Sequence, residues 1–415
     1  MKMSKTKYLL VGVILLAVAF PAVSGCAPEA PPKEKYVTFL SLTDLTGAIA
    51  GFTAPLEEAF GYYFDDLNRR GGVDGVTVRR ITVDTRYDIA RAVSAYKRYR
   101  FEHKVAMAFV PMTPATKALS PMLEKDKYIL LTPADGEFQA RIGRVFLAAP
   151  PYQDGCAASF DWILSDWKSK GKSGMPTVGY LLWDNPYGKE PLRGGKEYAE
   201  KVGVKLLPPE FFPTGASEHT VWLTRLAGAG ADYIFIGGVD PTPSLILRDA
   251  YKLGLTKTIQ FVDVTYWGPD EALGIKLHPE ATEGAVITSP FVRGDEARNH
   301  PLVIDLWTKY ANRPISEMRA LFPASILIGR AFEQALKIAL DGVGYDKLDG
   351  EAMYQAYQKL TGFDNQGLAG VNTYGPNSRR PSDVTKFYRI QGGKCVPITG
   401  WVKMPDAVSL HDWNE

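Results

Sequence analysis

The chain has 415 residues, of which 46% are hydrophobic and 23% are charged. This composition is that of a globular protein rather than a disordered or fibrous one, and the length is sufficient for two domains with separate cores. The formal net charge is +2, and the sequence contains no basic block or stripe. Composition therefore gives no indication of a nucleic-acid partner.

The N-terminal segment has the pattern of an export signal. Three lysines precede an apolar run over 8–20, which is too short to span a bilayer comfortably but fits the apolar part of a signal peptide. The following Val23-Ser24-Gly25-Cys26 resembles the bacterial lipobox, in which the cysteine becomes the lipidated first residue. We expect a signal peptide over 1–25, lipidation at Cys26 and a proline-rich tether over 26–35. The alternative is an ordinary cleavage site with an incidental cysteine.

The first predicted unit combines a strand, a loop of small residues and a helix. The run 36–41 suits a buried strand, and Leu56, Phe60, Tyr63 and Leu67 recur at helical spacing behind Pro55. The small residues between them allow the backbone to approach a ligand closely. We expect Phe52 to project from this loop.

Strands and helices then alternate along most of the chain. This spacing predicts an α/β fold with parallel sheets covered on both faces. Ligands in such sheets bind beyond the carboxyl ends of the strands, so the turns that follow the strands are the expected site. We expect further strands over 76–83, 105–110, 128–131, 177–183, 233–236 and 259–264, and a C-terminal hairpin with strands over 385–390 and 395–398.

The opening stretch from 36 to 88 resembles the type I solute-binding proteins of branched-chain amino acid ABC transporters. The shared pattern is a strand, Leu45-Thr46-Gly47, small residues, an aromatic residue, a helix and then the stretch 67–75. The likeness extends with gaps to about Trp401. It implies two Rossmann-like lobes joined by three crossing segments, with lobe 1 over 36–149 plus 291–380 and lobe 2 over 150–290 plus 381–415.

The resemblance also implies which residues contact the ligand. Thr113 matches the serine or threonine that holds a ligand carboxylate, and we place it as the N-cap of a helix with Pro114 at the first helical position. Phe52 and Tyr187 match aromatic residues of the two lobes. The predicted ligand-binding set is Phe52, Met112, Thr113, Thr132, Ala134, Asp135, Tyr187, Asp240, Thr265 and Tyr266. A helix cap for Thr113 and core packing for the aromatic residues are the alternatives.

The sequence departs from the amino-acid binders where those proteins hold the ammonium group. Val239 stands where they carry a tyrosine, and Thr265 stands where they carry an acid. A buried ammonium requires a carboxylate partner, which Asp135, Asp240 or Asp263 could supply. Tyr266 and Trp267 could stack on a planar ligand or pack within the protein.

Two cysteines remain after the predicted cleavage, Cys156 and Cys395. An extracytoplasmic location permits disulfides, and the resembled topology places both in lobe 2. They either form a disulfide or stay as two free thiols.

The sequence contains no pattern typical of catalysis. Its five histidines lack metal-ligand spacing, and it has neither a nucleophile elbow nor a phosphate-binding loop. We expect a non-enzymatic protein without cofactor or metal, which captures an amino acid or an aromatic or other organic carboxylate and delivers it to an ABC permease and its ATPase subunits. The alternative is a ligand sensor of the same fold that signals to a partner protein.

Overall fold

The computed structural model describes residues 34–102 and 104–414. The predicted signal peptide, the lipidation site Cys26 and most of the predicted tether lie outside these residues. Lys35–Glu415 form one compact unit. In the described part of the chain, no helix is both long and apolar enough to cross a membrane.

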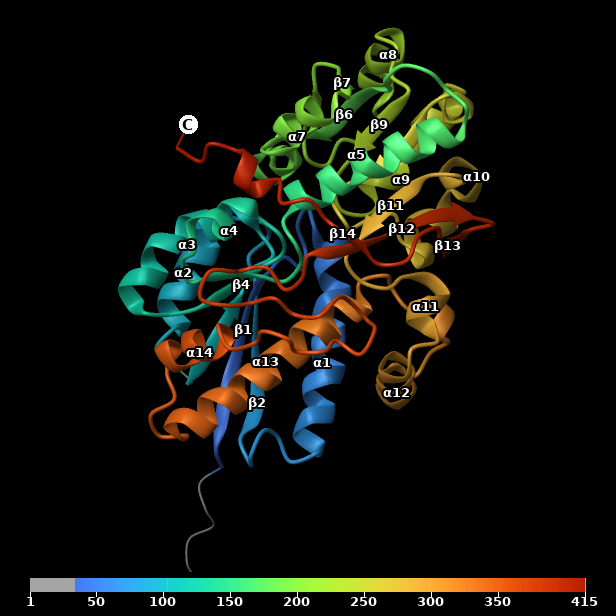
Figure 1. Ribbon diagram of the computed structural model, residues 1–415. Coiled ribbons are helices and arrows are strands. Elements are labelled where there is room, and N and C mark those ends of the chain that lie inside the picture. Colours follow the sequence, from blue (N-terminus) through green and yellow to red (C-terminus); the bar gives the residue numbers. More distant parts are fainter. Residues whose placement is uncertain (1–33, 103, 415) are drawn as a thin grey trace, which may run out of the picture. The chain divides into compact units, whose positions relative to one another are not determined.

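The first sheet is entirely parallel, with the strand order β2-β1-β3-β4-β5 (Figure 1). Strand β1, which lies between β2 and β3, is buried almost throughout, as expected of a parallel strand covered on both faces. The strands are β1 (Tyr36–Thr43), β2 (Thr77–Asp84), β3 (Val105–Phe109), β4 (Leu130–Thr132) and β5 (Val145–Leu147).

Helices from both ends of the sequence cover this sheet (Figure 1). On one face α1 (Ala50–Arg69) packs against α13 (Phe322–Val343), which in turn packs against α14 (Gly350–Tyr357). The other face is covered by α2 (Ile89–Tyr99) and α3 (Thr113–Asp126). The sheet and these helices form the first lobe, together with α4 (Gly136–Arg141) and α12 (Pro301–Tyr310).

The start of α1 differs from the sequence prediction. The helix begins at Ala50, so Phe52 lies in its first turn and Pro55 lies inside the helix rather than at its start. Proline lacks the N–H that would bond the Gly51 carbonyl four residues earlier. Arg319 Nη2 donates to that carbonyl at 3.1 Å instead, which compensates for the missing bond.

The second sheet is mixed, with the order β13-β12-β11-β10-β9-β6-β7. The strands from β6 to β11 are parallel, whereas β12 pairs antiparallel with β11, β13 and β14. The strands are β6 (Thr177–Trp183), β7 (Lys205–Leu206), β8 (Glu210–Phe212), β9 (Tyr233–Ile236), β10 (Gln260–Asp263), β11 (Val286–Ser289), β12 (Val384–Gln391), β13 (Lys394–Pro397) and β14 (Val402–Lys403).

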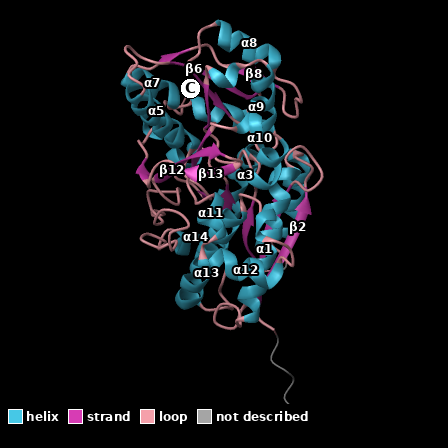
Figure 2. Cartoon of the chain, turned by 90° about the vertical axis from the view of Figure 1, so that its right-hand side faces the viewer, coloured by secondary structure: helices cyan, strands magenta, loops and turns pink. Residues whose placement is uncertain are grey.

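Two groups of helices flank the second sheet and complete the second lobe (Figure 2). One group contains α5 (Tyr152–Ser169) and α7 (Gly195–Val202), and the other contains α8 (Thr220–Gly228), α9 (Thr242–Lys252) and α10 (Pro279–Thr282). Shorter helices are α6 (Pro186–Lys189), α11 (Gly294–Arg298), η1 (Glu190–Leu192), η2 (Leu255–Lys257), η3 (Glu271–Ile275), η4 (Ile315–Glu317) and η5 (Val408–Leu410).

The C-terminal hairpin is confirmed. β12 and β13 pair antiparallel around Gly392 and Gly393, which have φ values of 56° and 76°. The tight two-residue turns that match the twist of a hairpin require positive φ at both positions, which glycine adopts readily.

The two cysteines do not form a disulfide in the structure; both are buried and free. They belong to different core clusters. Cys156 lies on α5 beside the Tyr180 hydroxyl, whereas Cys395 lies on β13. The pairing alternative drawn from the sequence is therefore wrong for this structure.

The chain passes between the two sheets in three places, through 148–151, 290–293 and 380–383. In each sheet the chain first adds a strand on one side of an interior strand and then adds the following strands on its other side. This switch falls between β1 and β3 in the first sheet and between β6 and β9 in the second. Open α/β sheets bind ligands beyond the strands at such switch points.

Candidate functional site

The loops at the two switch points enclose one pocket, which we call the cleft pocket. The first lobe contributes residues that follow its strands: Ile49, Phe52, Tyr87, Pro111, Thr113 and Pro133. The second lobe contributes Tyr152, Trp183, Tyr187, Val239 and Trp267. Phe52, Thr113 and Tyr187, which the sequence pattern singled out, therefore line a single cavity.

The cleft pocket is largely filled by aromatic rings. Tyr187 packs edge-on against Tyr152 and Trp183, with centroid distances of 5.4 and 5.6 Å. Phe52 of the first lobe meets Trp267 of the second at 5.3 Å. The cavity that remains between the rings has a volume of only about 20 Å³. The lobes are closed onto one another, so a ligand larger than a few atoms enters only when the rings or the lobes move apart.

Hydroxyl groups in the second-lobe wall are already hydrogen-bonded within their own lobe. Tyr187 Oη donates to the Gly238 carbonyl at 3.1 Å, and Tyr152 Oη accepts from Trp267 Nε1 at 2.5 Å. Burial raises the pKa of both tyrosines well above its usual value, so both stay neutral. These residues present ring surface to the pocket.

Trp183 is a pocket residue that the sequence analysis missed. It is the last residue of β6, its side chain is buried, and its Nε1 has no hydrogen-bond partner among the described residues. A buried indole N–H usually has an acceptor, so this donor is available to a ligand. The rule that strand ends mark the site would have found Trp183, because the predicted strand ended there.

Thr113 lies one position away from its predicted place in the helix. Met112 is the N-cap of α3, and Thr113 is the first helical residue with Pro114 directly after it. The Thr113 hydroxyl has no hydrogen-bond partner in the described part of the chain, so it does not cap the helix. It stays available at a helix N-terminus, where the helix dipole favours negative charge.

Seven of the ten predicted ligand-binding residues do not line the cleft pocket: two acids, Asp135 and Asp240, and five uncharged residues. The side chains of the five uncharged residues are buried, and three of them use their polar atoms inside the protein. Thr132 Oγ1 donates to the Val110 carbonyl, Thr265 Oγ1 bonds Asp263, and Tyr266 Oη donates to the Pro151 carbonyl. The Thr85 hydroxyl donates to Met112 Sδ at 3.2 Å, and the Tyr152 N–H donates to the Ala134 carbonyl.

The acids proposed for an ammonium group in the second lobe bind their own backbone instead. Asp263 accepts from the N–H groups of Thr265 and Gly268 at 2.8 and 3.1 Å. Asp240 accepts from the Ser244 hydroxyl and the Gly274 N–H at 3.0 and 3.2 Å. Burial raises the pKa of each of these two carboxyl groups to about 7, and in Asp240 the nearby Asp270 carboxylate adds to the rise. Neither side chain reaches the cleft pocket.

Asp135 belongs to a charged cluster between the lobes. Lys117 Nζ on α3 lies 3.6 Å from Asp135 Oδ2, 3.1 Å from Glu137 and 3.2 Å from Glu190 of the second lobe. Burial raises the pKa of Asp135 well above its usual value, and the Glu190 carboxylate adds to this rise. Gln153 Nε2 completes the cluster by donating to Glu190 at 2.9 Å. Asp135 thus lies beside Lys117 and does not line the pocket, although its Oδ2 has no hydrogen-bond partner among the described residues.

A second polar contact joins the lobes at the N-terminus of α1. Arg319, which precedes α13, forms an ion pair with Asp270 of the second lobe at 2.7 Å and also holds the Gly51 carbonyl. Gly51 lies close to the second lobe, because a Cβ built on it would be 3.3 Å from the Asp240 carbonyl. The closed arrangement is therefore held by polar contacts on two sides of the pocket.

The described residues that line the cleft pocket include no charged side chain. Within 34–102 and 104–414, no group of three His, Cys, Asp or Glu side chains is placed to hold a metal ion. The arrangement offers aromatic surface, the Thr113 hydroxyl, the start of α3 and the Trp183 N–H.

Comparison with known proteins points to one family. The family model for periplasmic binding proteins matches residues 37–394. The leucine-, isoleucine-, valine-, threonine- and alanine-binding protein of Pseudomonas aeruginosa is 22% identical over 268 residues, which cover 62% of this chain and 68% of that protein.

Solved structures show the same fold. A branched-chain amino acid ABC transporter protein from Thermus thermophilus with bound valine superposes with a TM-score of 0.79 and 21% identity, over 90% of this chain and 98% of that one. A solute-binding protein of an ABC transporter from Rhodopseudomonas palustris, in complex with p-hydroxybenzoic acid, gives 0.74 and 16%, over 90% and 98%. The resemblance drawn from the sequence is confirmed, and the chain belongs to the periplasmic binding protein family.

Proposed function

We propose that this protein is the solute-binding component of an ABC importer and that its ligand is a small aromatic carboxylate. The observation that carries the proposal is the cleft pocket, which lies at the switch points of both sheets and is lined by aromatic rings without a charged side chain. Ring surface favours a planar apolar ligand. The start of α3, Thr113 and Trp183 offer donors to its carboxylate.

An amino acid fits this pocket less well. Its ammonium group would need a carboxylate partner once it is removed from water. Asp135, Asp240 and Asp263 all have partners elsewhere, and none of them lines the pocket. An aromatic carboxylate, such as the one named for the Rhodopseudomonas palustris relative, makes no such demand.

The wider role follows from the family. We infer that the lobes, with the bounds 36–149 plus 291–380 and 150–290 plus 381–415, close on the ligand and present the closed form to a permease with its ATPase subunits. Ligand would stabilise the closed form by its higher affinity for that form. Lipidation at Cys26 would keep the protein at the outer side of a membrane, and the ligand would be returned unchanged.

A thermal-shift screen tests the ligand class. Benzoate, 4-hydroxybenzoate, phenylacetate, leucine, valine and benzamide are compared at equal concentration, and the aromatic carboxylates should raise the melting temperature most. Tyr187→Ala should remove the shift and Thr113→Ala should reduce it, and both variants should keep a cooperative unfolding transition. A shift with leucine or valine alone, or an unchanged shift in both variants, would reject the assignment.

Lipidation has its own test. Cells that express the full chain are grown with radioactive palmitate, and the label should appear in the wild-type protein and be lost in Cys26→Ser. An unlabelled wild-type protein would reject the anchor without bearing on the ligand.

A further inference from the structure

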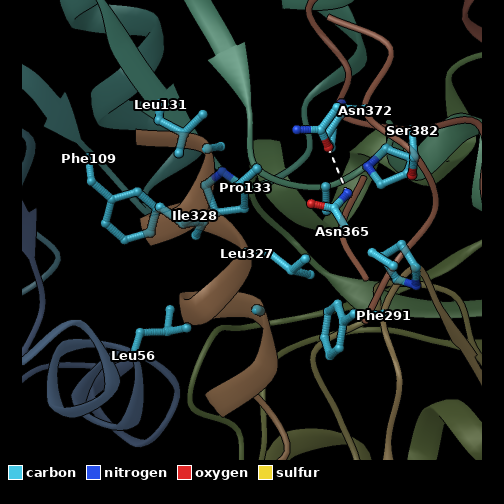
Figure 3. Close-up of a pocket in the computed structure, with 18 of the residues that line it drawn as sticks. Leu56, Phe109, Leu131, Pro133, Phe291, Leu327, Ile328, Asn365, Asn372 and Ser382 are labelled. Carbon is cyan, nitrogen blue, oxygen red and sulfur yellow. Dashed lines mark hydrogen bonds between the residues drawn. The ribbon is translucent and has the colours of Figure 1, made fainter. Parts of the chain in front are cut away.

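A second cavity lies where the chain crosses between the lobes, and we call it the hinge cavity (Figure 3). All three crossing segments contribute to its wall, through Ala149 and Pro150, through Phe291, and through Pro381. Helices α1 and α13 of the first lobe close it on the other sides. Its shape therefore depends on how the two lobes are joined.

The hinge cavity is adjacent to the cleft pocket. Phe52, Pro133 and Trp267 line both, so these three side chains are the partition between them. Two of the three are the rings that meet edge-on across the lobes at 5.3 Å. These two rings are therefore the part of the partition that would have to move for the two cavities to join.

Most of the hinge cavity is apolar, and its polar groups gather at one end (Figure 3). Asn365 Nδ2 donates to Asn372 Oδ1 at 2.8 Å and to the Gly370 carbonyl. Asn365 Oδ1 and Asn372 Nδ2 have no hydrogen-bond partner among the described residues, although both side chains are only 3% exposed. One free acceptor and one free donor therefore stand side by side, with no charged side chain among the lining residues that the structure describes.

This lining sets the chemistry of an occupant. A charged group would lose its hydration without gaining a partner, which is strongly unfavourable. An uncharged apolar group gains free energy from burial, and a terminal hydroxyl or amide could pair with the two asparagines. The hinge cavity has a volume of about 30 Å³. That is room for roughly two water-sized groups.

We propose that the hinge cavity is a second compartment of the ligand site, which receives an uncharged, mainly apolar substituent of the ligand passing between Phe52 and Trp267. The inference rests on the proposed function, because the carboxylate end of the same ligand lies in the cleft pocket. A substituent of two or three carbon atoms fills the hinge cavity as it stands. Ligand selectivity for length is thus set by the residues that line the hinge cavity.

A homologous series of probes tests this inference by isothermal titration calorimetry. The probes are benzoate and its 4-methyl, 4-ethyl, 4-propyl and 4-butyl derivatives. Each carbon added up to propyl should tighten binding by about fourfold, the value of one buried methylene. The gain should stop at butyl.

Two variants of α13 change the hinge cavity in opposite directions. Ala331→Phe fills it and should abolish the gain with length while benzoate still binds, whereas Leu327→Ala enlarges it and should extend the gain to butyl. Val343→Phe adds the same ring at an exposed position of the same helix and should behave like the wild type. Leu327→Ala keeps the test informative if Ala331→Phe does not fold.

The outcomes separate this inference from the proposed function. Benzoate binding with no dependence on length, or a length dependence that survives in Ala331→Phe, overturns the hinge compartment and leaves the proposed function standing. Failure of every probe to bind overturns both.

Discussion

The two walls of the cleft pocket use their polar atoms differently. In the first-lobe wall, the Thr113 hydroxyl at the start of α3 has no partner among the described residues. In the second-lobe wall, the hydroxyls of Tyr152 and Tyr187 are hydrogen-bonded to their own lobe, and the acids behind them bind their own loops. The first lobe therefore offers a free hydroxyl at a helix N-terminus, and the second offers a rigid aromatic surface in which the Trp183 N–H is also free within the described part of the chain.

The largest expected effect comes from removing an acid behind the second-lobe wall. Asp263→Ala leaves two buried N–H groups, those of Thr265 and Gly268, without their acceptor. It should lower the free energy of unfolding by about 4 kcal/mol, since each orphaned buried donor costs about 1–3 kcal/mol. Urea denaturation measures this loss, and Asp263→Asn, which keeps one acceptor oxygen, should lose less. An unchanged stability would contradict the view that this acid serves its own lobe.

A smaller effect should appear in the dependence of stability on pH. Asp240 has its pKa raised from 3.8 to about 7 by burial and by the Asp270 carboxylate, so the folded protein binds this proton more tightly than the unfolded chain does. The protonated Asp240 therefore stabilises the fold. This stabilisation is at its full value below about pH 4 and is lost as the pH rises through 7. Between pH 5.5 and 8 the wild type should lose about 2 kcal/mol more than Asp240→Asn.

Denaturation curves of both proteins at the two pH values measure this difference. Asp154 and Asp263, whose pKa values burial also raises to about 7, titrate in both proteins and cancel in the comparison. Parallel behaviour of wild type and variant would show that Asp240 is already charged in the folded protein.

The first-lobe wall should respond in affinity rather than stability. Thr113→Val keeps the shape of the side chain but removes the free hydroxyl, so benzoate should bind about tenfold more weakly with little change in melting temperature. Thr116 is the matched control one turn along, because its hydroxyl is bonded to the Met112 carbonyl and to Thr132. Thr116→Val should lower stability and spare affinity; the same response from both threonines would remove the distinction between the walls.

The smallest expected effect concerns the contact that joins the two walls. Arg319→Met removes the ion pair to Asp270 and the bond to the Gly51 carbonyl. The ion pair is partly exposed, so its loss should weaken benzoate binding by only about threefold, through a less populated closed form. Small-angle scattering of the ligand-free protein should show a larger radius of gyration for the variant. Tighter binding would indicate that this contact opposes closure.

The sequence predicted the fold well because the fold depends on local patterns. Short stretches of sequence are enough to recognise alternating apolar strands and helices and a hairpin turn with two glycines. The start of α1 was wrong because Pro55 is typical of a first helical turn. The carbonyl that Pro55 leaves without its helical partner is bonded by Arg319, which lies more than 260 residues away in the sequence.

The site was predictable only in part, for the same reason. Phe52, Thr113 and Tyr187 follow strand ends, and that position alone brought them to the pocket. Whether an acid such as Asp240 faces a ligand or its own backbone depends on partners contributed by distant segments. Burial and pairing of polar groups are properties of the three-dimensional packing, which spacing along the chain does not encode.

The order of the elements along the chain has a consequence for biogenesis. The five strands of the first sheet are complete by Leu147, but α13 and α14, which cover one face of that sheet, end at Val343 and Tyr357. In an emerging chain, α1 alone among the described helices covers that face until nearly nine-tenths of the chain has been synthesised. The first lobe therefore cannot complete its packing until α14 has been synthesised, and its apolar surface stays partly exposed during that interval.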